Sequence, residues 1–395
     1  MVSNININRR KLLTFSSAAI AGLSINQFLS KAYAQQVQNT ISYTLPMIDK
    51  VVMPDAKNPV RLNFNENALG MSPNAKQAAI NAVPKANRYA KAEIPLLNIR
   101  LAKHHNVNES QILLTDGSSE GIRSAIAAYV KPDTQLVIPE LTYSDGEHFA
   151  KIFNLHISKV PSLPDWQIDL RGLQKAVENY KGSSIVYLVN PNNPTSTVLA
   201  TDAIESWIKN KPKNTIFIVD EAYAEFVNDP AYKSVDHLIA EGCENIILLK
   251  TFSKIHAMAG LRVGYAVSSV ENIKHITQYV AGEKLNYCGV CAALASMDDQ
   301  TFLTYSKKAV DVSRQIMENV LSDLGLYYLK SETNFMFHKS PIDLKEYRDL
   351  MKSNFILIGR DFEPAKQWCR ISLGTPGEML YVANIMRGLK EKGKI

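Results

Sequence analysis

The sequence predicts an α/β fold in which a mostly parallel sheet is flanked by helices and is followed by a smaller α+β domain. Apolar runs of strand length alternate with stretches of helical periodicity through the middle of the chain. This alternation is typical of a parallel sheet covered on both faces. After about residue 275 the pattern changes to long helices and short strands, which indicates the second domain.

The elements of this fold can be assigned in order along the chain. Strands are predicted at residues 111–115, 135–138, 185–189, 215–219 and 246–249, with helices such as 120–130, 170–180 and 203–209 between them. The later part is predicted to hold a helix over 305–324, strands at 334–338, 355–358 and 369–373, and a last helix from Glu378. Ligands of such sheets bind at the carboxyl ends of the strands, and each predicted strand there closes on a polar or glycine-containing cluster.

The composition is that of an ordinary globular protein with no sign of nucleic-acid binding. The 395 residues are 46% hydrophobic and 21% charged, and four cysteines are too few for a disulfide scaffold. Four bases and no acids lie in the first 34 residues, so the net charge of +6 falls to +2 over the rest of the chain. A nucleic-acid interface would need a clustered excess of bases, and nucleic acid is therefore not an expected partner.

The N-terminus has the features of an export signal. A basic cluster at residues 9–11, a short apolar stretch over 12–23 and the small-x-small pattern of 32–34 predict a twin-arginine signal peptide over residues 1–34. Cleavage is expected after Ala34, with the twin-arginine export machinery as a partner and a periplasmic or secreted location. The alternative is an uncleaved anchor or an amphipathic N-terminal helix.

The predicted domain boundaries follow from these changes of pattern. An N-terminal arm and small-domain segment is expected over 35–70, a large domain over 71–275 and a C-terminal small domain over 276–395.

Three side chains at strand ends could act together on a cofactor that carries an aldehyde. Lys254 follows a buried strand, where partial desolvation favours a neutral amine able to form a Schiff base. Asp220 could hold a protonated ring nitrogen, and the phenol of Tyr223 could donate to a ring oxygen. Taken alone, each residue also fits an ordinary role: a surface lysine, a turn-capping aspartate and a packed tyrosine.

Two further clusters complete a possible cofactor pocket. Residues 117–119 (GSS) lie between a strand and a helix, where free N–H groups suit a phosphate, and Arg262 could add a charged contact. An ordinary helix N-cap is the alternative for these residues. Residues 190–195 (NPNNPT) form a rigid loop that could present the amide of Asn193 at a fixed point. Together the clusters describe a site for pyridoxal 5′-phosphate.

From about Arg61 to its C-terminus, the chain resembles the fold-type I pyridoxal-phosphate enzymes of the class I/II aminotransferases. The branch that it resembles most is that of the histidinol-phosphate aminotransferases. The likeness is carried by residues 62–67 (LNFNEN), 116–121 (DGSSEG), 190–195 (NPNNPT), 219–223 (VDEAY), 251–254 (TFSK), 260–265 (GLRVGY) and 369–375 (CRISLGT).

The resemblance implies a role for each cofactor-binding residue. Lys254 would be the Schiff-base lysine and proton carrier, and Asp220 would pair with the pyridinium nitrogen. Asn193 and Tyr223 would bind the ring oxygen, and Tyr143 would stack on the ring. The phosphate would be held by Ser118, Ser119, Thr251, Ser253 and Arg262.

The resemblance also implies the substrate contacts and a homodimer. Arg370 would clamp the substrate carboxylate with Asn67 near it, and Arg360 stands where the family carries a substrate-recognition arginine. Tyr89 would reach the phosphate of the neighbouring subunit. The chain departs from the family at Ser196, where glycine is usual, and at residues 90–93 (AKAE), which replace a proline-acid turn.

The implied activity is transfer of an amino group between an amino acid or other amino compound and a 2-oxo acid. Export argues against histidinol phosphate as the substrate, because that compound is a cytoplasmic intermediate. A decarboxylase or lyase on the same fold is the alternative, since one cofactor serves both reactions. A more remote alternative is a secreted serine hydrolase, because residues 117–121 also match the G-x-S-x-G pattern with Ser119 as nucleophile and a later histidine such as His338.

Cysteine and histidine spacing gives no sign of a metal site. Cys288 and Cys291 are three residues apart at a predicted helix start, where packing of two small side chains is preferred over a redox or metal pair. The histidines show no metal-ligand spacing.

Overall fold

The computed structural model describes residues 53–395, which belong to one compact unit. The predicted signal peptide over 1–34, its cleavage site and the first part of the predicted arm lie outside the described residues. Within residues 53–395, no helix is long and apolar enough to cross a membrane.

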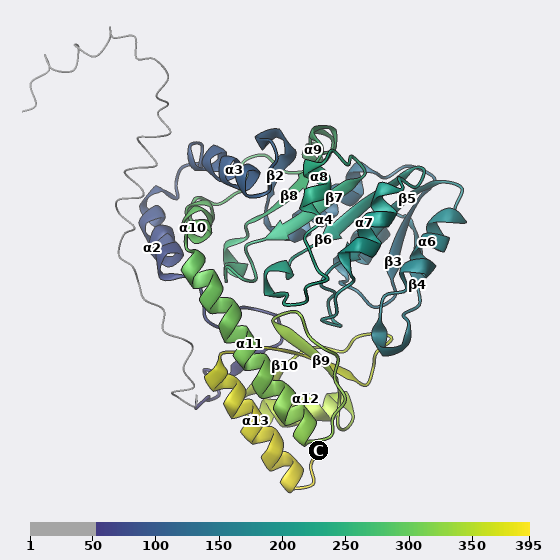
Figure 1. The fold of residues 1–395 in the computed structure, drawn as a ribbon. Helices are drawn as coiled ribbons and strands as arrows, with labels where there is room; N and C mark the ends of the chain where they lie inside the picture. The colour runs from purple at the N-terminus through teal and green to yellow at the C-terminus, as the bar shows by residue number, and fades with distance from the viewer. Residues whose placement is uncertain (1–52) are drawn as a thin grey trace, which may run out of the picture. The chain divides into compact units, whose positions relative to one another are not determined.

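The central layer is a seven-stranded sheet with the order β2-β8-β7-β6-β5-β3-β4 (Figure 1). All neighbouring strands from β7 to β4 are parallel, whereas β8 runs antiparallel to both β2 and β7. The predicted fold, a mostly parallel sheet flanked by helices, is confirmed. The strands are β2 (Ile112–Thr115), β3 (Thr134–Pro139), β4 (His156–Val160), β5 (Ser183–Val189), β6 (Thr215–Asp220), β7 (Ile246–Thr251) and β8 (Gly264–Ser268).

Helices cover both faces of this sheet because successive strand residues point to opposite sides. Along β5, Ile185, Tyr187 and Val189 belong to the core under α4, α5 and α9. Val186 and Leu188 belong to the core under the helices of the other face, which include α3, α6, α7, α8 and α10. The helices are α2 (Pro73–Ala82), α3 (Glu93–His104), α4 (Gly117–Ala128), α5 (Asp145–Ile152), α6 (Leu170–Glu178), α7 (Thr201–Lys209), α8 (Asp236–Ala240), α9 (Val270–Thr277) and α10 (Tyr287–Asp298).

The C-terminal part has a separate core that includes the N-terminal strand β1. Strand β1 pairs in parallel with β10, and β11 pairs antiparallel with β9. The long helix α11 packs against α13, which begins with a capping box between Thr375 and Glu378. The elements are β1 (Val60–Leu62), α11 (Gln300–Asp323), β9 (Phe335–Lys339), α12 (Leu344–Ser353), β10 (Ile356–Ile358), β11 (Trp368–Ser372) and α13 (Pro376–Glu391).

Candidate active site

The carboxyl ends of β5, β6 and β7 bring together residues that are distant in the sequence. Asp220 is the last residue of β6 and lies opposite Val189 of β5 and Leu249 of β7. The loop after β5 carries Asn193, and the turn after β7 carries Lys254. Their proximity follows from the parallel order of the strands, because the ends of neighbouring parallel strands meet at one edge.

Asp220 is a buried carboxylate with two hydrogen bonds from the protein. Its side chain is 2% exposed. Its Oδ1 accepts from the Ala222 N–H at 3.1 Å, and its Oδ2 accepts from the Tyr187 hydroxyl at 3.3 Å. Burial raises the pKa of Asp220 to about 6, while the two hydrogen bonds and the charge of Lys254 oppose that rise. The site therefore holds a carboxylate that gains strongly from a cationic partner.

Lys254 and Tyr223 lie side by side at this edge. The Nζ of Lys254 is 3.2 Å from the carbonyl oxygen of Asn65 and 5.5 Å from the centre of the Tyr223 ring. The buried Tyr223 hydroxyl accepts a hydrogen bond of 3.1 Å from Nδ2 of Asn65. The amine and the phenol are thus held close to the Asp220 carboxylate by a residue from the segment that follows β1.

A cradle for an anion lies at the N-terminus of α4. Gly117 begins this helix with a φ of +73°, and a Cβ on it would come within 2.1 Å of Nη2 of Arg262. The Arg262 guanidinium is 3.5 Å from Oγ of Ser253 and 3.4 Å from the carbonyl of Asp116. The N-terminus of α4, where Ser118 lies, this guanidinium and the linked hydroxyls of Ser253 and Thr251 fit a phosphate group.

Ser119 is paired with an aspartate and not with a histidine. Its hydroxyl donates to Oδ2 of Asp145 at 2.6 Å and also lies within hydrogen-bonding reach of the Tyr143 side chain. His338 lies in β9, where its Nδ1 donates to the carbonyl of Lys339 and burial lowers its pKa to about 4. Within residues 53–395 no hydrogen bond joins Ser119 to a histidine. The serine-hydrolase alternative is not supported, because its nucleophile lacks a base.

Arg370 reaches the cofactor-facing loop from the second part of the fold. From its place in β11, its Nη1 donates to Oδ1 of Asn193 at 2.8 Å, and its Nη2 donates to the carbonyl of Asn63 at 2.8 Å. The side chain is buried, which lowers its pKa, and its Nε is a buried donor without a hydrogen-bond partner within the described part of the chain. Arg370 therefore retains a charged donor for a ligand.

Arg360 lies next to Arg370 but is open to solvent. Its guanidinium is 4.9 Å from the ring of Phe362, and that of Arg370 is 5.2 Å from the same ring. Its Nη2 lies 3.5 Å from the hydroxyl of Ser144, just before α5. Two cationic groups thus border one aromatic surface, which favours an anionic ligand there.

The structure gives the contacts of Asn67 and the exposure of Tyr89. The Nδ2 of Asn67 donates to the carbonyl of Lys254 at 3.2 Å and to Oγ of Ser306 at 2.8 Å, so it holds the turn that carries the lysine. Asn65 is the asparagine of this motif that reaches Tyr223. Tyr89 is 63% exposed, so its predicted contact with a second subunit stays a prediction.

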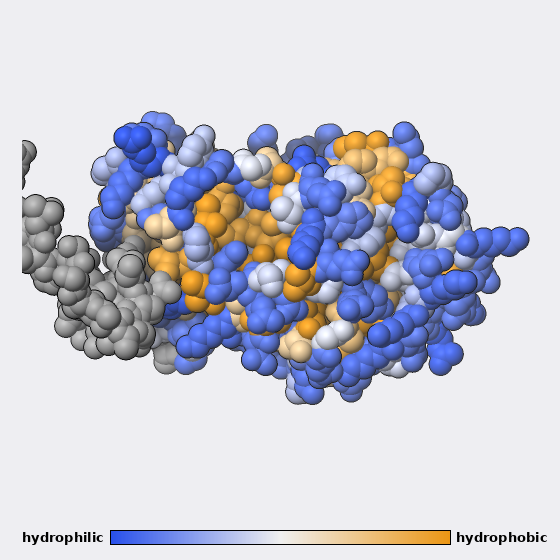
Figure 2. Space-filling model, turned by 90° about the horizontal axis from the view of Figure 1, so that it is seen from above, coloured by the Kyte–Doolittle hydropathy of each residue, from blue (hydrophilic) through white to orange (hydrophobic). Residues whose placement is uncertain are grey.

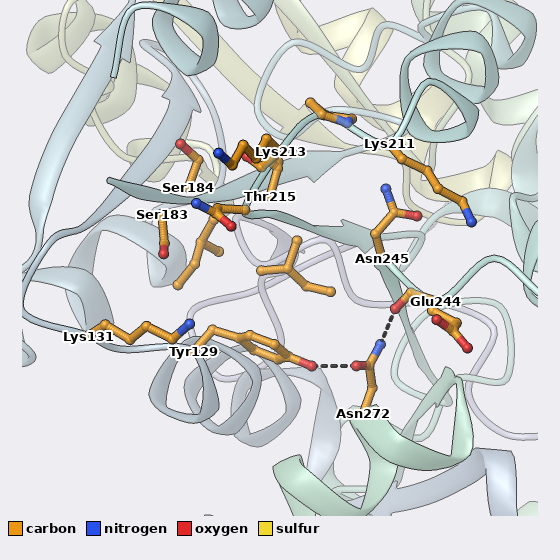
Figure 3. A pocket seen from close by; sticks show the side chains of 14 residues that line it. Tyr129, Lys131, Ser183, Ser184, Lys211, Lys213, Thr215, Glu244, Asn245 and Asn272 are labelled. Carbon is orange, nitrogen blue, oxygen red and sulfur yellow. Dashed lines mark hydrogen bonds between the residues drawn. The ribbon is translucent and has the colours of Figure 1, made fainter. Parts of the chain in front are cut away.

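A cavity of about 380 Å³ lies at the opposite edge of the sheet (Figure 3). Its walls come from the amino ends of β5, β6 and β7, and the Tyr129 hydroxyl there donates to Oδ1 of Asn272. None of the predicted site residues lines it. Among residues 53–395 no cluster of histidine, cysteine or acidic side chains could hold a metal ion, and Cys288 and Cys291 are free thiols.

The fold and the site define a pyridoxal-phosphate-dependent enzyme of fold-type I. A buried carboxylate, a lysine after the adjacent strand and a glycine-lined anion cradle provide a partner for each end of this cofactor. Residues 57–386 match the family of class I and II aminotransferases, and the chain belongs to this family. It is a pyridoxal-phosphate-dependent aminotransferase.

Similar proteins share both the sequence and the fold. A crystal structure from Erwinia carotovora atroseptica, provisionally named a histidinol-phosphate aminotransferase, is 59% identical with a TM-score of 0.85 and covers 90% of this chain and 100% of its own. The pyridoxal-5′-phosphate complex of histidinol-phosphate aminotransferase from Sinorhizobium meliloti is 26% identical with a TM-score of 0.77, covering 84% and 91%. The histidinol-phosphate aminotransferase of Moorella thermoacetica is 29% identical over 320 residues, 81% of this chain and 82% of its own.

Proposed function

We propose that this aminotransferase moves an amino group from a donor that carries a carboxylate to a 2-oxo acid, with Lys254 as its catalytic residue. The observation that carries the proposal is the buried Arg370, whose Nη1 donates to Asn193 and whose Nε has no hydrogen-bond partner among residues 53–395. A carboxylate would satisfy this donor and gain a charge-assisted hydrogen bond. An exposed Arg360 beside the same aromatic ring suits a second acidic group on the donor or the acceptor.

Bound pyridoxal phosphate supplies an aldehyde for exchange with amines and a ring that withdraws electrons. Asp220 would hold the protonated ring nitrogen, and Asn193 and Tyr223 would hold the ring oxygen. Because Oδ1 of Asn193 already accepts from Arg370, its amide N–H groups are the ones free to donate to that oxygen. Tyr143 would cover the ring face. The phosphate would be held by Ser118, Ser119, Thr251, Ser253 and Arg262.

Lys254 is placed to carry a proton at its Nζ. The amine lies among the carbonyls of Phe64 and Asn65 and the ring of Tyr223, where it is half-buried. A positioned amine contributes general acid–base catalysis when it can take a proton from one atom and return it to another. Asn67 supports this by fixing the backbone carbonyls of Lys254 and Ile255.

The decisive experiment is the absorption spectrum of the purified protein during addition of single amino donors. Conversion of the cofactor to its amine form by one donor would identify that donor, and the series includes histidinol phosphate because the relatives carry that name. Lys254→Ala should retain bound cofactor but lose turnover, while Lys366→Ala, an exposed site, should behave as the parent. Normal turnover by Lys254→Ala would contradict the proposal.

We also propose that the enzyme is a homodimer. Large apolar side chains are exposed at Phe64, Ile80, Val83 and Tyr89, and Figure 2 shows hydrophobic surface on the face of the molecule seen from above. Such surface favours a protein partner. Val83→Lys should yield a monomer in light scattering, whereas Tyr89→Phe should stay dimeric and bind the cofactor more weakly. A parent protein that is monomeric would contradict this proposal.

Export by the twin-arginine route is the remaining part of the proposal. It is supported by the paired arginines at residues 9 and 10 and by the small residues at 32 and 34. Arg9→Lys with Arg10→Lys should leave the protein in the cytoplasm, as measured by cell fractionation. An unchanged distribution would contradict the twin-arginine route.

A further inference from the structure

A fully buried tyrosine lies beside Asp220. Tyr187 is in the middle of β5. Val189, two residues further along this strand, lies opposite Asp220 in the parallel pair β5–β6. Side chains two residues apart point to the same face of a strand, so Tyr187 is the diagonal neighbour of Asp220 on the face covered by α4 and α5. An aromatic side chain is long enough to span such a diagonal.

The hydroxyl of Tyr187 has one hydrogen-bond partner in the described structure. It lies 3.3 Å from Oδ2 of Asp220, and an ionised carboxylate can only accept, so the phenol donates. The other oxygen of Asp220 accepts from the N–H of Ala222. Hydrogen bonds at catalytic groups are often long without ligand and tighten when the ligand is present. The Tyr187 hydroxyl and the Ala222 N–H therefore each hold one oxygen of the Asp220 carboxylate and fix its orientation.

A glycine in α5 makes room for this ring. A Cβ on Gly146 would come within 2.4 Å of Cδ1 of Tyr187, although glycine inside a helix is less stable than alanine. The ring of Tyr187 therefore packs directly against α5 at Gly146. Other ionisable groups that act on this carboxylate include Asp145, Lys254 and Tyr143.

We propose that Tyr187 is a positioning residue of the reaction, which keeps Asp220 ionised and aimed at the ring nitrogen of the bound cofactor. The inference rests on the proposed role of Asp220. A carboxylate that has lost a donor binds a proton more tightly, so it would draw the proton away from the ring nitrogen and weaken the electron withdrawal that the reaction needs. Asp145 adds to this tendency because its charge also raises the pKa of Asp220.

The test compares Tyr187→Phe, Asp220→Asn and the control Tyr347→Phe in the full-length enzyme. Tyr347 is equally buried, but within residues 53–395 its hydroxyl hydrogen-bonds to Sδ of Met386 alone, at 3.8 Å. Loss of one hydrogen bond to a charged group corresponds to about a tenfold change in a binding constant. Tyr187→Phe should therefore raise the dissociation constant of pyridoxal phosphate, measured by equilibrium dialysis, about tenfold. It should lower kcat with KM unchanged and shift the pH titration of the cofactor absorption.

The outcomes separate this inference from the role on which it rests. If Asp220→Asn changes affinity and titration but Tyr187→Phe does not, Tyr187 only packs and the inference is overturned. If Asp220→Asn changes neither, the proposed role of Asp220 itself fails. Gly146→Ala offers a second test. It should weaken cofactor binding when introduced into the parent enzyme, and it should cause no further loss of affinity when introduced into Tyr187→Phe. Independent effects of the two substitutions would contradict the link.

Discussion

Nη1 of Arg370 donates a hydrogen bond of 2.8 Å to Oδ1 of Asn193, although the two residues are 177 positions apart in the chain. The contact joins β11 of the C-terminal part to the loop after β5. It orients both partners, because the amide oxygen of Asn193 is occupied and the Arg370 guanidinium is fixed in its plane. The proposed substrate clamp and the proposed ring-oxygen contact are therefore one structural unit.

Substitution of Arg370 by lysine should show how much of its effect on activity comes from its positive charge and how much from the geometry of its hydrogen bonds. The amine introduced by Arg370→Lys would keep the positive charge but could not donate to Asn193, Asn63 and a carboxylate together. We expect kcat/KM for the amino donor to fall by about 10- to 100-fold, the equivalent of one or two lost charge-assisted hydrogen bonds. Steady-state kinetics with the donor found by spectroscopy measures this. Arg387→Lys, at an exposed ion pair with Asp323, is the control, and an equal loss in both variants would contradict the prediction.

Gly117→Ala should destroy the phosphate cradle. The new Cβ would meet Nη2 of Arg262 at 2.1 Å, so the guanidinium would have to leave the N-terminus of α4. We expect the dissociation constant of pyridoxal phosphate to rise at least tenfold, since one charge-assisted contact is worth about 1.5–3 kcal/mol. Equilibrium dialysis of the parent enzyme and of Gly117→Ala measures this dissociation constant.

Gly70→Ala is the matched control for that experiment. Gly70 has the same φ of +73°, but a Cβ on it would meet no atom within 4 Å. Both variants carry the cost of a left-handed alanine, and only one clashes with Arg262. Similar cofactor affinity in the two variants would show that the cradle does not bind the phosphate.

Ser196 has the backbone conformation that glycine would favour. It is fully buried with a φ of 62°, its N–H donates to the carbonyl of Asn192, and its carbonyl accepts from Glu332. The departure from the usual glycine thus leaves a serine in the left-handed region. We expect Ser196→Gly to have a free energy of unfolding about 1 kcal/mol higher than that of Ser196→Ala, since both lose the hydroxyl but only alanine keeps the conformational cost.

Denaturant unfolding of the two Ser196 variants tests this difference. Ser124, buried within α4, provides the reverse case, because alanine is favoured over glycine by about 1 kcal/mol inside a helix. The order of stability should therefore invert between the two positions. The same order at both would contradict the conformational account of Ser196.

The sequence predicts those parts of the site that are local in the chain. Lys254, Asp220 and Asn193 each follow a continuous apolar run, so strand and polar cluster can be seen together. Parallel pairing then explains their proximity. Strand β4 does not follow from the sequence pattern, because its exposed and half-buried residues lack a continuous apolar run.

Contacts between distant segments could not be predicted in the same way. Asn65 and Asn67 are the same residue type in one motif, so the sequence does not tell which amide reaches Tyr223; in the structure it is Asn65, whose backbone is left-handed with a φ of 54°. Tyr187 has the pattern of a core aromatic residue in a buried strand. Its bond to Asp220 depends on the register of β5 against β6, which single-strand patterns do not contain.

Acid should destabilise the protein through its buried histidines. Burial lowers the pKa of His338 to about 4, whereas an unfolded chain has a histidine pKa of about 6.5. Between these values the unfolded state binds more protons, so stability is full above about pH 6.5 and is lost as the pH falls towards 4, by about 3 kcal/mol in all.

His256 should also destabilise the protein as the pH falls, since burial lowers its pKa to about 4 as well. His338→Gln should therefore reduce the slope of unfolding free energy against pH in this range without abolishing it. Denaturant titrations at several pH values measure the slopes, and a His338→Gln slope equal to that of the parent would contradict the assignment of a neutral His338 in the folded state.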